Sequence, residues 1–374
     1  MGRNRWILEC PKRARANEQR VSLRVVCLPP AGSGGSIFFP WEARLQELIP
    51  EWTRTECDDD HLEAVVKNVQ VLPIELPGRS SRYKEPLVKD MVEIVQQLVD
   101  GLEEPFLRDD VPFVIVGHSF GSWIAFEMTR EIEKRGLKRP VALMTSAIRS
   151  PRLAGVQNDI DSTEMHSLQE EEFWRKMEER YGKNKELEHP SIRKMMGPIL
   201  QADFQIAETY MPLPDSHVTC PLFVSGGSED VRYNKKMLQA WDECTTDSHF
   251  TVNTFPGGHS YLFKPSESLD AHLYFLLGAI KETGLGSSQC HGFDASSAVN
   301  SVEATVSVSN STFSETGATV ASSMSHQQAK DRPGALASPK VASHEMSRHG
   351  QSIPDAEGEK DGIFSCASKS CSIQ

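Results

Sequence analysis

A serine lies between two glycines in Gly117-His118-Ser119-Phe120-Gly121, directly after the apolar run PFVIV and before the helical pattern SWIAFEMTREIEK. The pattern G-x-S-x-G recurs by chance. Between a strand and a helix, however, it is typical of a sharp turn that exposes a nucleophilic serine. These residues therefore predict nucleophilic catalysis by the Ser119 hydroxyl, with an ordinary glycine-lined turn as the alternative.

His259 is the candidate general base, because a serine hydroxyl is a poor nucleophile until a base takes its proton. It lies in FPGGHSYLF after the last predicted strand, where two glycines free the loop to reach the sheet edge. The third group should be an acid between serine and histidine, at a strand end, where it fixes the imidazole tautomer. Asp230, in PLFVSGGSEDVR, meets both conditions; Glu229 is the alternative, and Asp203 and Asp215 lie away from predicted strand ends.

The oxyanion that forms during attack needs two hydrogen-bond donors. One is expected from the backbone N–H of Phe120, the residue after the nucleophile. The other is expected from the loop PPAGSGG, whose first available N–H is that of Ala31, since Pro29 and Pro30 have none. A flexible turn or a phosphate loop is the alternative, although no GK[ST] sequence follows.

Six β-rich runs alternate with helical patterns along the chain. The runs lie at 21–28, 69–76, 112–118, 141–147, 221–227 and 249–255. Several are apolar throughout, as buried parallel strands are. Between them, the helical pattern at 91–102 places Val92, Val95, Leu98 and Val99 on one face. The alternation predicts an α/β fold, a mostly parallel sheet with helices on both faces.

Three other regions depart from this pattern. Residues from about 150 to 215 are helical and charged, which predicts an insertion outside the sheet. Residues 1–20 form a basic extension before a catalytic domain at 21–284. From Gly286 to Gln374, 20 of the 89 residues are serine and none is Trp or Tyr, so we expect 285–374 to be a disordered tail.

The composition excludes several classes of protein. The net charge of −12 opposes binding to nucleic acid, which requires a basic surface. No apolar run is long enough to span a membrane or to form the core of a signal peptide. Eight cysteines without a CxxC pattern predict reduced thiols in a cytoplasmic protein. The acidic run ECDDDH at 56–61 indicates a solvated loop, and we expect neither a metal nor a cofactor.

Both ends of the chain carry possible targeting signals. Cys371 begins the C-terminal CSIQ, which fits a farnesylation signal except for Ser at its second position. An inert end is the alternative, and membrane association is expected only if Cys371 is modified. Because one prenyl chain anchors only marginally, stable attachment would require a second signal. The basic N-terminus could serve as a short plastid or mitochondrial targeting segment.

Assembled in this order, the motifs resemble an α/β-hydrolase. More narrowly, they resemble the type II thioesterases of polyketide, fatty-acid and nonribosomal-peptide synthesis. The resemblance runs from about Leu23 to Lys281 and rests on LPPAGSGG with its downstream Trp, ELPGRSSRYKEPL, GHSFGSWIAFEMTREI, PILQADFQIAETY, CPLFVSGGSEDVRYNKKMLQAW and FPGGHSYLF. The loop PPAGSGG departs from the Pro-aromatic-Ala-Gly-Gly of that family, which bears on the Ala31 donor.

The resemblance implies that Ser119, Asp230 and His259 form a catalytic triad and that residues 150–215 form a lid over an acyl channel. It also implies hydrolysis of acyl groups from the phosphopantetheine thiol of an acyl-carrier protein, for product release or editing. A carboxylesterase or lipase that acts on oxygen esters is the alternative within this fold. A non-catalytic binding protein is the alternative from another class.

A carrier partner raises a question of charge, because an acidic enzyme that meets an acidic carrier needs local basic side chains. Four lid residues are candidates for that role: Arg175, Lys176, Arg193 and Lys194. Apart from its carrier, the protein is expected to be a monomer.

Overall fold

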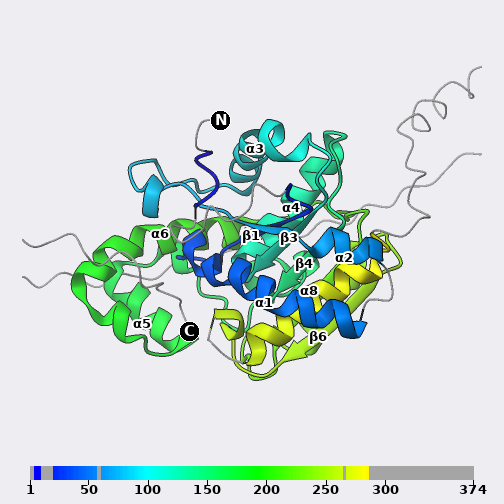
Figure 1. Cartoon of the computed structure of the whole chain (residues 1–374). Coiled ribbons are helices and arrows are strands. Elements are labelled where there is room, and N and C mark those ends of the chain that lie inside the picture. Colours follow the sequence, from blue (N-terminus) through cyan, green and yellow to red (C-terminus); the bar gives the residue numbers. More distant parts are fainter. Residues whose placement is uncertain (1–3, 10–19, 57–59, 264–266, 286–374) are drawn as a thin grey trace, which may run out of the picture. The chain divides into compact units, whose positions relative to one another are not determined.

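A computed structural model describes residues 4–9, 20–56, 60–263 and 267–285 of the chain (Figure 1). The strands are β1 (Leu23–Leu28), β2 (Val69–Pro73), β3 (Phe113–His118), β4 (Ala142–Ser146), β5 (Leu222–Gly227) and β6 (Phe250–Phe255). The helices are α1 (Phe39–Glu56), α2 (Asp60–Val66), α3 (Met91–Leu102), α4 (Phe120–Lys134), α5 (Glu170–Tyr181), α6 (Pro190–Thr209), α7 (Lys235–Gln239) and α8 (Glu267–Glu282). Each predicted strand is thus present, one or more residues shorter than its apolar run.

The six strands form one parallel sheet in the order β2-β1-β3-β4-β5-β6. Val26 of β1 pairs with Ile115 of β3, and Ile115 pairs with Leu143 of β4. β2 pairs with one side of β1, and β3 pairs with the other side. The connections that follow β1 and β3 therefore run in opposite directions from the carboxyl ends of these two strands. Such a switch point is where open α/β sheets bind ligands. The loops that carry Ala31 and Ser119 leave the sheet here, whereas Asp230 and His259 follow β5 and β6.

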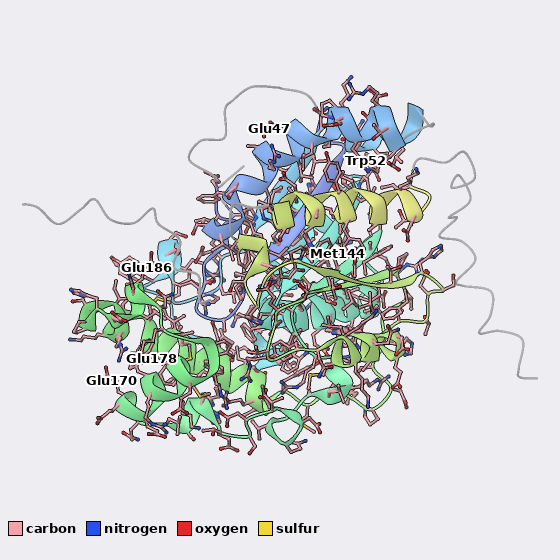
Figure 2. All side chains as sticks on the ribbon, turned by 90° about the horizontal axis from the view of Figure 1, so that it is seen from below. Glu47, Trp52, Met144, Glu170, Glu178 and Glu186 are labelled. Carbon is pink, nitrogen blue, oxygen red and sulfur yellow. The ribbon has the colours of Figure 1, made fainter. Side chains whose placement is uncertain are left out.

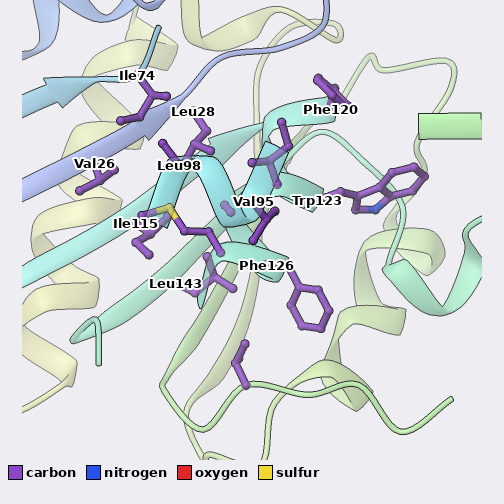
Figure 3. Close-up of a cluster of buried hydrophobic side chains, with 14 of the residues drawn as sticks. Val26, Leu28, Ile74, Val95, Leu98, Ile115, Phe120, Trp123, Phe126 and Leu143 are labelled. Atoms are coloured by element: carbon purple, nitrogen blue, oxygen red, sulfur yellow. The ribbon is translucent and has the colours of Figure 1, made fainter. Parts of the chain in front are cut away.

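Each face of the sheet is covered by its own pair of helices. α3 contacts α4 on one face, and α1 contacts α8 on the other. Figure 3 shows the first face, where Leu28, Ile115 and Leu143 of the strands meet Val95, Leu98 and Phe126 of the helices. Full burial of such a side chain contributes roughly 1.5–3 kcal/mol, so these two cores hold the strand ends in place.

Helix α3 corrects one detail of the predicted pattern. Asp90 caps its first turn by accepting a hydrogen bond from the Glu93 N–H at 2.9 Å. Val92, expected on the apolar face, is exposed, whereas Met91 and Ile94 are buried in the core. The true stripe begins one residue earlier, because positions i, i+3 and i+4 from Met91 face the sheet.

The segment between β4 and β5 is helical, as predicted. Its helices α5 and α6 lie side by side, apart from the sheet layers (green in Figure 1). They enclose a small apolar core of their own, which includes Phe173, Trp174, Met177, Leu200 and Phe204. This segment, the lid, therefore fills its interior with its own side chains.

Residues 4–9, which we placed in an extension before the domain, pack along β2. Ile7 forms an antiparallel bridge with Ile74, and the Trp6 side chain is 1% exposed. The indole takes the space that a side chain at position 101 would need, because a Cβ on Gly101 would lie 2.1 Å from it. The Arg82 guanidinium lies 4.0 Å from the Trp6 ring centroid. These residues belong to the folded unit.

Three further predictions concern membrane-spanning helices, the cysteines and the C-terminal tail. Among the described residues, no helix is long and apolar enough to cross a bilayer. Cys27, Cys220 and Cys244 are buried free thiols. The tail with Cys371, and residues 57–59 of the acidic run, lie outside the described residues.

Candidate active site

Ser119 occupies a strained turn between β3 and α4. Its φ of 51° and ψ of −126° are unusual for a residue with a side chain. The Ser119 N–H donates to the Ser146 carbonyl at 2.7 Å, which fixes the turn against β4. A Cβ on Gly117 would lie 2.5 Å from the Gly121 carbonyl, and one on Gly121 would lie 2.4 Å from the Leu28 carbonyl. Both glycines are therefore required by close backbone approach, and the turn presents the serine at the sheet edge.

The structure brings Ser119, His259 and Asp230 together from three loops. His259 Nε2 lies 2.9 Å from Ser119 Oγ, and Nδ1 lies 2.9 Å from Asp230 Oδ2. The second oxygen of Asp230 accepts from the Arg232 and Tyr233 backbone N–H groups at 2.9 and 3.3 Å. The Asp230 side chain is 1% exposed and that of His259 is 13% exposed. With a proton on Nδ1, Nε2 can accept the serine proton.

A buried network of hydrogen-bonded side chains lies next to His259. His118 Nδ1 lies 2.7 Å from Ser146 Oγ, which in turn lies 3.1 Å from the Tyr261 hydroxyl. Tyr261 donates to Ser225 Oγ at 2.8 Å. Burial, together with the neighbouring His259, holds the pKa of His118 well below its usual value, so this imidazole is neutral. His118 thus packs beneath the site, with its ring centroid 5.6 Å from that of His259.

The two predicted oxyanion donors lie beside the nucleophile. Ala31, Phe120 and Ser119 line one cavity, and neither the Ala31 N–H nor the Phe120 N–H has an acceptor among the described residues. The next N–H along the loop, that of Gly32, donates to Asp203 Oδ2 at 2.8 Å. Of these two neighbouring N–H groups, that of Ala31 therefore remains available, and its role as an oxyanion donor stays a prediction.

A buried ion pair between Arg79 and Asp203 joins this loop to α6, whereas we had considered Asp203 only as a less favoured catalytic acid. Arg79 donates to both oxygens of Asp203, at 2.9 and 2.7 Å, and to the Ser33 carbonyl at 3.3 Å. Asp203 belongs to α6, so one carboxylate holds both the PGR segment and Gly32. The sequence offered one signal for this pair: Arg79 lies in ELPGRS and Asp203 in ILQADFQ, and both segments carry the resemblance to type II thioesterases.

The cavity at Ser119 measures about 60 Å³ and is partly polar. Arg232 lines it and pairs with Asp159 at 2.6 Å. Tyr181, from the end of α5, and Tyr233 flank the imidazole of His259, with ring centroids 6.0 and 5.6 Å from its own. The lid therefore contributes directly to the surroundings of the predicted base.

Other predicted residues take different places. Glu229 and Asp215 are both exposed. The basic candidates on the lid are largely neutralised: Arg175 pairs with Glu172 and Glu179, Lys176 pairs with Glu179 at 3.2 Å, and Arg193 pairs with Glu178 at 2.7 Å. Figure 2 shows Glu170, Glu178 and Glu186 together on the lid. The surface of α5 is therefore predominantly acidic.

Comparison with known proteins agrees with this geometry. Residues 23–276 match the family model of the thioesterase domain. The chain is 28% identical over 262 residues to the gramicidin S biosynthesis protein GrsT of Aneurinibacillus migulanus, covering 70% of this chain and 89% of GrsT. It is 28% identical to the medium-chain S-acyl fatty acid synthase thioesterase of Homo sapiens, covering 66% and 83%.

A solved structure extends the likeness to the fold. The type II thioesterase BorB, from the borrelidin biosynthetic cluster, superposes with a TM-score of 0.57 at 27% identity, covering 75% of this chain and 99% of BorB. This confirms the predicted α/β-hydrolase fold, and the family match confirms the predicted class of enzyme, a thioester hydrolase. The chain belongs to the thioesterase family.

Proposed function

We propose that this enzyme hydrolyses acyl thioesters through an acyl-enzyme formed on Ser119. The arrangement that carries the proposal is the pair of 2.9 Å contacts that link Ser119 Oγ to His259 and His259 to Asp230. Ser119 attacks the thioester carbonyl while His259 takes its proton, and the Phe120 and Ala31 N–H groups stabilise the oxyanion. The thiol leaves with the proton from His259, and a water that His259 activates then releases the acid.

We further propose that the thioester is carried on the phosphopantetheine arm of a carrier protein. The names of the relatives support this, because they place GrsT in gramicidin S biosynthesis and BorB in a borrelidin cluster. The acidic side chains of α5 would repel an acidic carrier. We therefore expect the carrier to dock away from that helix, and expect kcat/KM on an acyl-carrier substrate to exceed that on the matching acyl-pantetheine.

The test is Ser119→Ala, assayed with acyl-pantetheine and with p-nitrophenyl esters. We expect kcat to fall roughly 10⁴-fold or more, because the nucleophile acts as a unit with its base. Intact mass measurement should show an acyl adduct on the wild-type protein and none on the variant. The exposed lid serine in Ser167→Ala provides the matched control and should retain full turnover.

Two results would contradict the proposal. One is turnover retained in a folded Ser119→Ala protein, which would exclude this nucleophile. The other is hydrolysis of oxygen esters with no hydrolysis of thioesters, which would favour a carboxylesterase.

A further inference from the structure

The carboxylate of Asp230, the proposed triad acid, is oriented by the turn that follows it. One oxygen lies 2.9 Å from His259 Nδ1, and the other accepts from two backbone N–H groups of the turn, those of Arg232 and Tyr233, at 2.9 and 3.3 Å. A carboxylate held through both oxygens cannot rotate without losing a contact, so the position of this turn decides how Asp230 meets the imidazole.

The side chain of Arg232 anchors this turn. Val231, the residue before it, is 84% exposed, whereas the Arg232 side chain is 4% exposed. One terminal nitrogen of Arg232 donates to Asp159 at 2.6 Å. The guanidinium carbon lies 5.2 Å from the ring centroid of Tyr181 and 5.8 Å from that of Tyr233. Since Asp159 and Tyr181 both belong to the lid, the lid holds the turn of the triad acid.

Asp159 is fixed in turn by Arg149, which follows β4. Arg149 donates to Asp159 at 2.6 Å, and its other nitrogens donate to the carbonyls of Leu153 and Gly155 at 2.6 and 3.2 Å. The Arg149 carbonyl accepts from the Trp123 indole at 2.9 Å, and the guanidinium carbon lies 5.2 Å from the centroid of that ring. Trp123 belongs to α4, so a continuous series of contacts joins the helix of the nucleophile to the turn of the acid.

Both guanidinium groups share the single carboxylate of Asp159. The three side chains are at most 11% exposed, so salt screens their charges little. Burial raises the pKa of Asp159, but Arg232 and Arg149, together with hydrogen bonds to the carboxylate, hold it below its usual value. Without this negative charge the two cations would repel each other. Arg149 would keep its two carbonyl partners, so we expect Arg232 to move, and the turn with it.

We propose that Asp159 and Arg232 are positioning residues, through which the lid keeps Asp230 within hydrogen-bond distance of His259. The inference rests on the proposed function and adds two residues that act through Asp230. Loss of the pair should slow the chemical steps, because a misplacement of about 1 Å can cost roughly 10²-fold in rate. Both residues also line the cavity at Ser119, so the alternative is a role in acyl binding, which would change KM.

The first test is Asp159→Asn, which keeps the size of the side chain and removes its charge. On butyryl-pantetheine, we expect kcat of the full chain to fall about 10- to 100-fold and KM to change less than about threefold. Inactivation by phenylmethanesulfonyl fluoride should slow by a similar factor, because this small probe reports on the serine and its base. Asp159→Glu retains the charge and should keep more of kcat than Asp159→Asn does.

Asp109→Asn is the matched control, because it makes the same change in a different ion pair. Asp109 accepts from both terminal nitrogens of Arg24, at 2.7 and 2.6 Å. Arg24 lies at the start of β1, at the sheet edge opposite the active site. We expect Asp109→Asn to lower the stability of the protein while its folded form keeps the wild-type kcat.

A double-mutant cycle tests whether the two positioning residues act together. Arg232→Gln removes the cation and leaves Asp159 paired with Arg149, so it provides a second variant if Asp159→Asn does not fold. Each single variant should lose kcat. The double variant should lose little more than either single variant, because the same contact is missing in all three.

Three results would overturn the inference while leaving the proposed function intact. They are a wild-type kcat in folded Asp159→Asn, a change confined to KM, and additive losses of kcat in the double variant. An equal loss of kcat in Asp109→Asn would overturn it as well, since reduced stability would then explain the effect. Failure of the wild-type chain to hydrolyse any thioester would contradict the proposed function instead, and the inference with it.

Discussion

At the scale of single residues, two histidines other than His259 are buried in the folded domain. His118 and His272 are both fully buried. His272 lies among Trp41, Phe255 and Tyr261, and neither of its ring nitrogens has a partner among the described residues. Burial lowers the pKa of His272 to about 3, so the imidazole is neutral in the folded protein.

This low pKa predicts a loss of stability in mild acid. The unfolded chain protonates His272 below about pH 6.5 while the folded chain does not, so the free energy of unfolding falls as the pH falls. At pH 5.5 this histidine alone costs about 1.4 kcal/mol. Urea unfolding of the wild type and of His272→Phe at pH 7.5 and pH 5.5 should show the variant gaining that amount at the lower pH. An equal difference at both values would contradict the assignment.

The residues that sequence reasoning located are those whose chemistry is tied to a local motif. Ser119 is marked by its glycines, His259 by its glycine loop and Asp230 by the strand before it. The role of Arg79 depends on Asp203, 124 positions away, and on the buried pair that the two residues form. Such a role follows from packing across the chain, and no spacing in the sequence encodes it.

At the scale of elements, a buried ion pair connects helix α6 to the loop after β1, the predicted oxyanion loop. The Arg79–Asp203 pair links them, and its side chains are only 6% and 2% exposed. Removing one partner of a buried pair leaves an unpaired charge, which destabilises far more than replacing both partners does.

We therefore predict strong non-additivity in a double-mutant cycle. Arg79→Met and Asp203→Leu should each lower the free energy of unfolding by about 3–5 kcal/mol, and the double variant should lose much less than their sum. Chemical denaturation of the four proteins measures this coupling. Simple addition of the two losses would show that the pair is not a unit.

The same pair should affect catalysis through position. Asp203→Leu removes the acceptor of the Gly32 N–H and should lower kcat, since an oxyanion loop displaced by about 1 Å can cost 10²-fold. Asp203→Asn retains an acceptor oxygen and should keep more of kcat. Equal kcat values for the two folded variants would argue against a positioning role.

The strands and the helices on the sheet were predictable because their pattern repeats every two or every three to four residues. The face of α3 was misjudged by one residue, because Val92 is apolar yet lies on the solvent side. The role of residues 4–9 was missed because so short a segment has no period, and its place is set by the space that Gly101 leaves for Trp6.

At the scale of the whole molecule, the two ends of the chain should respond differently to change. Trp6→Ala removes a fully buried indole that Arg82 covers, so we expect a loss of about 3–5 kcal/mol in the free energy of unfolding. Thermal and urea unfolding measure that loss. A change below about 1 kcal/mol would show that residues 4–9 are dispensable to the fold.

A chain shortened to end at Leu285 should keep its stability and its turnover, because every described strand and helix precedes that residue. Unfolding and kcat/KM on one acyl-pantetheine provide the comparison with the full chain. The same truncation removes Cys371, so a lipid anchor there predicts that only the full-length protein partitions with membranes. A truncated chain that fails to fold would assign the tail a structural role.

His259 follows Ser119 by 140 residues, and the strand that positions it, β6, is added to the outer edge of the parallel sheet. A chain is synthesised from its N-terminus, and β6 pairs with β5 only after both strands have been made. During synthesis Ser119, the proposed nucleophile, therefore emerges well before His259, its proposed base. If these roles hold, we expect a half-made copy to cleave no acyl intermediate until β6 has paired with β5.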